Sequence, residues 1–197
     1  MTQDAYEHQF SNWMKARLDE IGATLTLIEK SAATLHADAK KQAEHTIAQI
    51  RTQRQTFEEA IRKRQHESEA AWTKAKATLE ADWASFETAV QDYVKHAQLS
   101  AQQQAATFEA RSAAQRKAWE ETISALRKQA GTAASERKRD LDAAVTHLQS
   151  QADAARAKLE ASQKAGAESW AAFKDALQES RAAFDKASQK ALEAFRK

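Results

Sequence analysis

The chain has 197 residues, with no cysteine, no proline and only three glycines, and its 30 basic and 28 acidic residues leave a formal charge of +2. This balance argues against a strong field for nucleic acid or membranes, and the lack of cysteine excludes disulfides and thiolate chemistry. Ala, Glu, Lys, Leu and Arg supply 106 residues, a share typical of coiled coils and long helices. Leu, Ile, Val and Phe supply only 28, which favours helix pairing over a large compact core. We therefore expect an all-α protein with very long amphipathic helices.

Apolar residues recur three or four positions apart from near residue 4 almost to the end of the chain. The stretch from Trp72 to Val94 shows this best, because its large apolar residues follow one another at spacings of 7, 4, 3, 4 and 4. Such spacing places them on one face of a helix. The predicted helix-packing stripe consists of Ile50, Ile61, Trp72, Leu79, Trp83, Phe86, Val90, Val94, Phe108, Trp119, Leu148, Leu159, Trp170, Phe173, Leu177, Phe184 and Phe195.

Part of this stripe repeats every 11 residues, a hendecad period. Ile50, Ile61, Trp72, Trp83 and Val94 are each 11 residues apart. Three turns of an α-helix hold about 11 residues, so these side chains lie almost in one line. The period predicts nearly straight helices with weak supercoiling.

A shift of 98 residues superposes the first half of the chain on the second. Trp72 then matches Trp170, and Phe86 matches Phe184. This self-similarity indicates a tandem duplication, with residues 1–98 as the first helical repeat and residues 99–197 as the second. Trp83, however, matches Arg181, so we expect the two halves to differ in what they face.

Three segments show weaker helical signals than their surroundings: residues 98–106, Gly131 and Ser162–Gly166. Ser100 and Gln103 form a capping-box pattern in the first segment, which favours a helix start there. We prefer an antiparallel helical hairpin that folds near residues 98–106, or an extended coiled-coil bundle. Because the stripe stays in phase across all three segments, one uninterrupted helix is the alternative.

The aromatic residues of the stripe have two interpretations. In an alanine-rich seam, sparse Trp and Phe fill the places where helices separate, and this packing role is the one we prefer. Bulky aromatics beside lysines are also typical of helices that lie on lipid. The basic clusters, such as Arg137, Lys138 and Arg139, have acidic neighbours and argue for a solvated face rather than nucleic-acid binding.

No catalytic or cofactor motif is present in the sequence. The six histidines show no spacing of four residues and no HExxH pattern, so we expect no metal site. There is no glycine-rich phosphate loop and no G-x-S-x-G sequence. We expect a protein without enzymatic activity and without a cofactor.

Residues Ala16 to Trp72 carry the segments Leu18-Asp19-Glu20, Ala37-Asp38-Ala39 and Ile50-Arg51-x-x-Arg54, and end on Trp72. In these segments the chain resembles small bacterial alanine-rich coiled-coil proteins of unknown function. The resemblance implies a bacterial helical protein and transfers no activity or site. A looser pattern is similar to phasins and to apolipoprotein-type helices.

These observations predict a self-associating, non-enzymatic coiled-coil scaffold or structural protein that forms homo-oligomers by helix pairing. The alternative is an amphipathic protein that coats lipid or storage-granule surfaces with the same stripe. The first residues lack a signal-peptide pattern, and no run of 18 apolar residues occurs, so we expect a cytoplasmic location.

Overall fold

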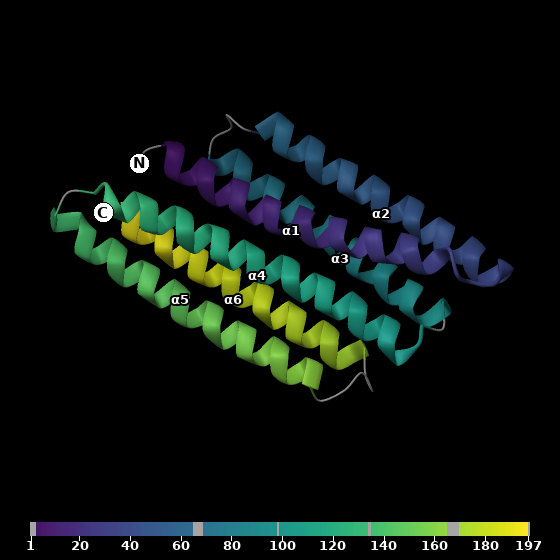
Figure 1. Ribbon diagram of the computed structural model, residues 1–197. Helices are drawn as coiled ribbons and strands as arrows, with labels where there is room; N and C mark the ends of the chain where they lie inside the picture. Colours follow the sequence, from purple (N-terminus) through teal and green to yellow (C-terminus); the bar gives the residue numbers. More distant parts are fainter. Residues whose placement is uncertain (1–2, 65–68, 98, 134, 165–169, 197) are drawn as a thin grey trace. The chain divides into compact units, whose positions relative to one another are not determined.

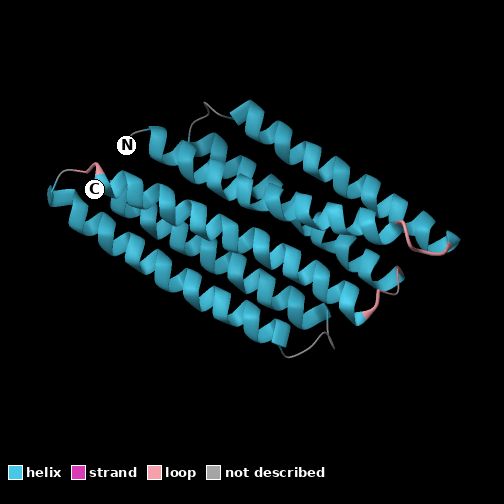
Figure 2. Ribbon diagram, in the orientation of Figure 1, coloured by secondary structure: helices cyan, strands magenta, loops and turns pink. Residues whose placement is uncertain are grey.

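The computed structural model describes residues 3–64, 69–97, 99–133, 135–164 and 170–196. Over these residues the chain forms six α-helices and no strand, as Figures 1 and 2 show. The all-α class is therefore confirmed. The composition explains it, because alanine and long unbranched side chains lose little entropy in a helix and proline is absent. The helices are α1 (Gln3–Ala32), α2 (Ala37–Arg64), α3 (Glu69–His96), α4 (Ala101–Gly131), α5 (Ser135–Lys164) and α6 (Trp170–Arg196).

Three of the helix ends lie at or beside the weak segments of the sequence. α4 begins within residues 98–106, α4 ends at Gly131, and α5 ends inside Ser162–Gly166. The predicted capping box is formed: the Ser100 amide donates to Gln103 Oε1 at 2.9 Å, and the Gln103 amide donates to Ser100 Oγ at 3.2 Å. These contacts satisfy backbone donors that the first turn of α4 cannot pair internally.

Two further helix ends, at Ala32 and Arg64, were not predicted. The described residues are therefore not one uninterrupted helix: three helices precede the segment 98–106 and three begin within it or after it, while the hairpin stays a prediction. The turn after α1 resembles the turn after α4. In the first, the amide and hydroxyl of Thr34 donate to the Ser31 carbonyl, and in the second, those of Thr132 donate to the Gln129 carbonyl. The two turns lie 98 residues apart in the sequence, which equals the predicted repeat length. The duplication itself stays a prediction.

The helices group into two compact units. Unit 2 is Arg17–Arg111, and unit 1 combines Met1–Ala16 with Ser112–Lys197. The boundaries fall inside α1 and α4, so each of these helices contributes to both units. The division into residues 1–98 and 99–197 is a division by sequence similarity and stays a prediction.

Each unit has its own apolar core. In unit 2, α2 packs against α3 and the fully buried side chains include Ile28, Ile50 and Phe57. In unit 1, α5 packs against α6. The unit 1 core consists of Ala118, Trp119, Ile123, Leu126, Val145, Leu148, Ala155, Phe184, Ala187 and Ala191.

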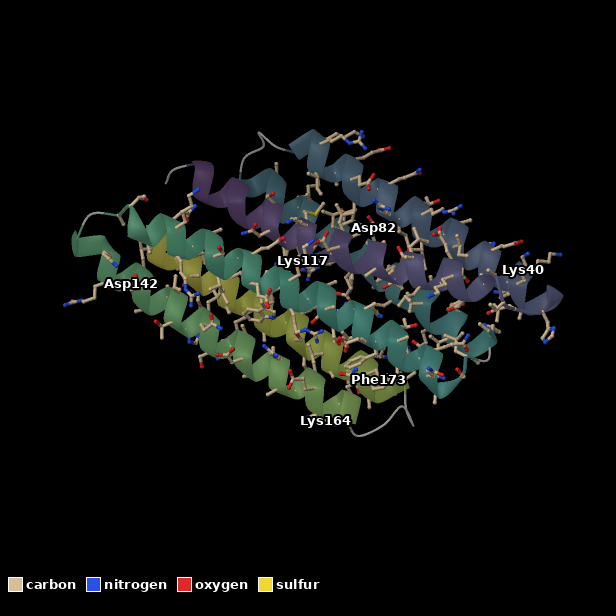
Figure 3. All side chains as sticks on the ribbon, in the orientation of Figure 1. Lys40, Asp82, Lys117, Asp142, Lys164 and Phe173 are labelled. Carbon is tan, nitrogen blue, oxygen red and sulfur yellow. The ribbon has the colours of Figure 1, made fainter. Side chains whose placement is uncertain are left out.

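The helices expose charge and bury apolar groups, as an amphipathic pattern requires. In Figure 3, Lys40, Asp142 and Lys164 are exposed, whereas Phe173 of α6 is buried. None of the described helices has an apolar stretch long enough to cross a membrane.

Candidate functional site

Most residues of the predicted stripe lie inside the two units. Their burial follows from the spacing of the stripe, which keeps the apolar groups on one side of each helix. The buried members are Ile50, Leu79, Phe86, Val90, Val94, Phe108, Trp119, Leu148, Leu159, Phe173, Leu177 and Phe184.

The other five members differ. Ile61, Trp83 and Trp170 are only half-buried. Trp72 and Phe195 belong to α3 and α6, but the structure describes only their backbone. Where a stripe residue is half-buried, its apolar surface is partly left to solvent or to a second molecule.

The interior of unit 2 holds an arginine between two carboxylates. Arg111 of α4 is fully buried; its Nε donates to Glu20 Oε1 of α1 at 2.8 Å, and its Nη2 donates to Glu87 Oε1 of α3. Burial disfavours the charge, but the carboxylates of Glu87 and Glu20 outweigh it and raise the pKa of Arg111 above its ordinary value. The guanidinium therefore stays charged, and the triad fixes three helices against one another.

Aromatic rings continue this charged cluster across unit 2. The Arg111 guanidinium lies 5.4 Å from the centre of the Phe86 ring, within cation–π range. Phe86 contacts Trp83 at 4.8 Å between ring centres, and Trp83 meets Phe57 edge to face at 6.4 Å. Arg17 covers the Trp83 ring at 5.7 Å. All four helices that build unit 2 contribute to this network.

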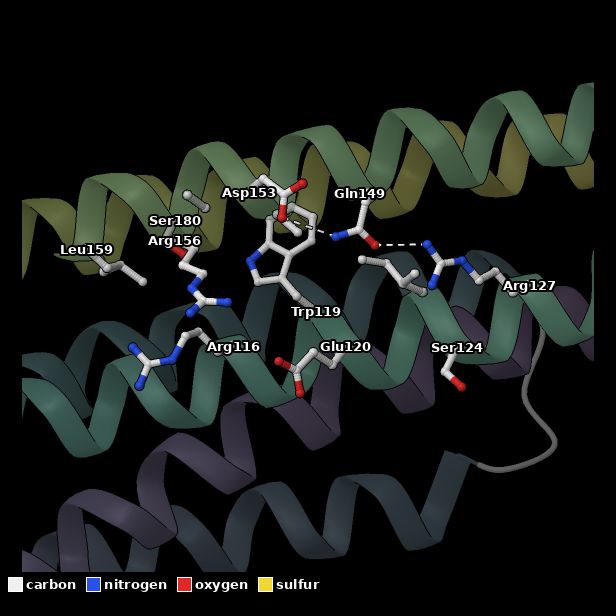
Figure 4. Close-up of a pocket in the computed structure, with 13 residues that line it drawn as sticks. Arg116, Trp119, Glu120, Ser124, Arg127, Gln149, Asp153, Arg156, Leu159 and Ser180 are labelled. Carbon is white, nitrogen blue, oxygen red and sulfur yellow. Dashed lines mark hydrogen bonds between the residues drawn. The ribbon is translucent and has the colours of Figure 1, made fainter. Parts of the chain in front are cut away.

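Unit 1 has a partly open pocket of about 260 Å³ between α4 and α5, with Ser180 of α6 at its inner side (Figure 4). Its apolar wall includes Trp119, which meets Phe184 edge to face at 5.0 Å between ring centres. Trp119 and Ser180 are nine-tenths or more buried, yet Trp119 Nε1 and Ser180 Oγ have no hydrogen-bond partner among the described residues. A buried polar atom left unpaired costs about 1–3 kcal/mol. The lining residues are Arg116, Trp119, Glu120, Ile123, Ser124, Arg127, Gln149, Ala152, Asp153, Ala155, Arg156, Leu159 and Ser180.

Arginines outnumber carboxylates around this pocket, by three to two. Gln149 links the two helices, because its Oε1 accepts a hydrogen bond from Arg127 Nη2 at 3.1 Å and its Nε2 donates to Asp153 Oδ1 at 3.2 Å (Figure 4). Arg156 Nε donates to Glu160 Oε1 at 2.8 Å, a contact that raises the pKa of Arg156 and lowers the pKa of Glu160. The pocket thus combines an apolar wall with a rim on which arginines and carboxylates balance once Glu160 is counted.

Several residues of the basic clusters, which include Arg51 as well as Lys138, form ion pairs with nearby carboxylates. Arg51 Nη2 lies 2.6 Å from Glu29 Oε1, and Lys138 Nζ lies 2.7 Å from Asp142 Oδ2. Such exposed pairs leave little net positive potential at these positions. Within the described residues, no three His, Asp or Glu side chains lie close enough together to hold a metal ion.

Neither the triad nor the pocket was predicted from the sequence. The triad joins residues 91 and 24 positions apart, and nothing in the local pattern marks a buried arginine among many exposed ones. The sequence did predict that the two halves differ at Trp83 and at Arg181, 98 residues later. The structure gives these two residues different surroundings: Arg181 is buried and its Nε donates to the Leu177 carbonyl at 3.2 Å.

Comparison of the chain with protein-family models, with curated proteins and with solved structures finds no match. The function must therefore be argued from the geometry of the two units. The triad has a structural role as an interior clamp, while the pocket has the space and the donors for a ligand.

Proposed function

We propose that the chain is a non-enzymatic helical scaffold, a structural protein that self-associates through pairing of its helices. The observation that carries this proposal is the use of the apolar stripe: its described aromatic and aliphatic residues pack helices together. The ionisable groups at the two interior sites are either held in tight pairs or line a small pocket. Neither arrangement presents a nucleophile with an adjacent general base.

Self-association is supported by the stripe residues that the units cover only in part. Ile61 of α2, Trp83 of α3 and Trp170 of α6 each keep some exposed apolar surface. A second copy of the chain is the occupant that suits them, because copies share the same 11-residue spacing and helices with equal spacing interdigitate. Pairing of this kind would extend the helices into a coiled-coil assembly.

Light scattering coupled to size-exclusion chromatography tests this proposal. Over about a hundredfold range of protein concentration, we expect the mass to rise from that of one chain to that of a defined oligomer. Replacement of Ile61 by Gln should shift the transition to higher concentration. Thr52→Gln, at an exposed position of the same helix, is the matched control and should leave it unchanged. A constant monomer mass over the whole range would refute self-association.

A surface-coating role is the second candidate, and α6 is the observation that favours it. This helix buries Phe173, Leu177 and Phe184 on one face and exposes Lys186 and Lys190 on another. An amphipathic helix of this composition can lie in a lipid interface if the bundle opens. Cosedimentation with anionic vesicles, together with a gain of helical circular dichroism, would support this role over the scaffold. A chain that is fully helical without vesicles and stays in the supernatant would exclude it.

Two further expectations belong to the same proposal. We place the protein in the cytoplasm, which the lack of cysteine fits. We also retain the resemblance to small bacterial alanine-rich coiled-coil proteins, for which an all-helical chain is the expected fold. Neither expectation bears on the oligomer experiment, so that test stands alone.

A further inference from the structure

We propose that the pocket between α4 and α5 of unit 1 binds a small carboxylate with a compact apolar body, held through Trp119 Nε1 and Ser180 Oγ. This binding site is independent of the scaffold role. Its main feature is the pair of buried donors that lack a described hydrogen-bond partner. An indole N–H can only donate, and both atoms are buried in a place that no described acceptor reaches.

The two donors belong to the same pocket. Trp119 projects from α4 and Ser180 from α6, and both are among the groups that line it. In Figure 4 the indole nitrogen of Trp119 is turned toward the side of the pocket where Ser180 and Arg156 lie. A carboxylate has two acceptor oxygens, so one group can satisfy both donors at once.

Three arginines line the pocket and give an anion guanidinium groups to contact. Arg116, Arg127 and Arg156 lie there with Glu120 and Asp153, and Glu160 beside the lining binds Arg156, so these charges balance and the two buried donors set the preference for an acceptor. Asp153 already accepts a hydrogen bond from Gln149, so one of its carboxylate oxygens is engaged by an amide and not by an arginine. Guanidinium groups bind carboxylates in a planar, two-point geometry, and a partly enclosed site strengthens the contact.

The size and the wall of the pocket limit the ligand further. About 260 Å³ lies just below the usual range of pockets for drug-sized ligands, so only a small molecule fits. Ile123, Ala155, Leu159 and the Trp119 ring supply an apolar surface. We therefore expect one apolar ring or a short alkyl chain attached to the carboxylate.

Unit 2 lacks these features at the matching positions. The residues 98 positions before Trp119, Ala155 and Ser180 are an isoleucine, a phenylalanine and an aspartate. Unit 2 thus has no indole or hydroxyl donor at these positions, and its phenylalanine is fully buried where unit 1 has the small side chain of Ala155. Space and donors occur together in unit 1, which supports a binding site over a packing defect.

Nuclear magnetic resonance of the full chain labelled with ¹⁵N tests the proposal, with sodium benzoate as the probe. Trp119→Phe identifies the Trp119 indole N–H signal. Benzoate should shift that signal to saturation with a dissociation constant on the order of 1 mM, as expected for so few atoms. Benzyl alcohol, which is neutral, should bind at least about tenfold more weakly because it lacks the charged acceptor.

Variants decide whether the two donors are responsible. Ser180→Ala should weaken benzoate binding about tenfold, whereas Ser188→Ala should not change it. Ser188 is the matched control because it is also a buried serine of α6 and does not line the pocket. Ala155→Phe should abolish binding by filling the space; if that variant does not fold, the serine pair still decides.

Three results would overturn the proposal. Benzoate could cause only the linear, unsaturable shift that sodium chloride causes, which means that water alone occupies the pocket. Benzyl alcohol could bind as well as benzoate, which means that the site selects only for apolar bulk. Equal effects of Ser180→Ala and Ser188→Ala would remove Ser180 from the contact.

Discussion

Unit 2 and unit 1 fill their interiors differently at positions 98 residues apart. Unit 2 has Phe57 on α2 and Trp83 on α3, and these rings meet edge to face. At the matching positions, unit 1 has Ala155 on α5 and Arg181 on α6. Large apolar groups in unit 2 therefore correspond to a small residue and a charged residue in unit 1, and the small residue, Ala155, lines the pocket.

The buried ion pair, in contrast, lies in unit 2, the unit with the larger apolar groups. Unit 2 buries Arg111 and Glu20. At the positions 98 residues away, unit 1 has Trp13 and Ala118. Unit 2 thus tolerates a charged clamp beside a filled aromatic cluster, while unit 1 has an aromatic core beside an open pocket. Similar helix lengths and similar stripes therefore do not imply similar interiors, because a few large side chains decide what each unit encloses.

The largest expected effect comes from emptying the aromatic cluster of unit 2. Phe57→Ala should lower the free energy of unfolding by about 4 kcal/mol, because a fully buried ring leaves a cavity among rigid neighbours. Urea unfolding followed by circular dichroism measures it. Thr56→Ala, at the exposed neighbouring position, is the control. A loss below about 1 kcal/mol would mean that unit 2 is not packed around Phe57.

Removal of the buried arginine should have the next largest effect. Arg111→Ala leaves Glu20 and Glu87 without their shared cation, and we expect a loss of about 3 kcal/mol. Since Glu87 is partly exposed, the loss should lie at the lower end for a buried pair. The matched control is Arg156→Ala, which breaks only an exposed ion pair in unit 1 and should cause no measurable change. Equal results for both variants would contradict the clamp.

Exchange of one residue between the registers should cost less. Trp83→Arg gives unit 2 the residue that unit 1 has 98 positions later. The variant loses the ring contacts of Trp83 and places a second cation beside Arg17, so we expect a loss of about 2 kcal/mol. Ala84→Arg on the exposed side of the same helix controls for the added charge. If the two variants are equally stable, Trp83 does not contribute to the unit 2 network.

The smallest expected effect is a loss of stability at alkaline pH. Burial raises the pKa of the Tyr93 phenol in unit 2 above 10.0, and the matching residue in unit 1 is Ala191. The unfolded chain ionises this phenol near about pH 10 while the folded chain keeps its proton. The contribution of the Tyr93 phenol to the free energy of unfolding is therefore complete below that pH. It is lost as the pH rises toward the pKa of the folded chain. Urea midpoints should fall above about pH 10 in the wild type and fall less in Tyr93→Phe. Equal slopes would contradict the burial of Tyr93.

Much of the fold could be predicted from the sequence, because helix formation depends on local composition and spacing. The capping box at Ser100 and the helix end at Gly131 have local signals, and both were found. The ends at Ala32 and Arg64 have no glycine or proline beside them. They could have been found by applying the 98-residue shift to Gly131 and Gly166, since a turn in one half then predicts a turn in the other.

The interiors could not be predicted in the same way, because they depend on contacts between distant helices. Arg111 is one of many arginines, and only the position of α1 and α3 around it makes it buried. The pocket depends on Ala155, one of 46 alanines. Its one sequence signal is the loss of Phe57 in the shifted register, which becomes informative only when the residues around both positions are known.

The free energy of unfolding of Ala155→Phe tests the central claim most directly, namely that unit 1 has open space where unit 2 is filled. If the pocket is open, the added ring fits, and the stability should change by less than about 1 kcal/mol while benzoate binding disappears. If unit 1 is packed as densely as unit 2, the ring must displace its neighbours. A loss of about 2–3 kcal/mol would then contradict the account.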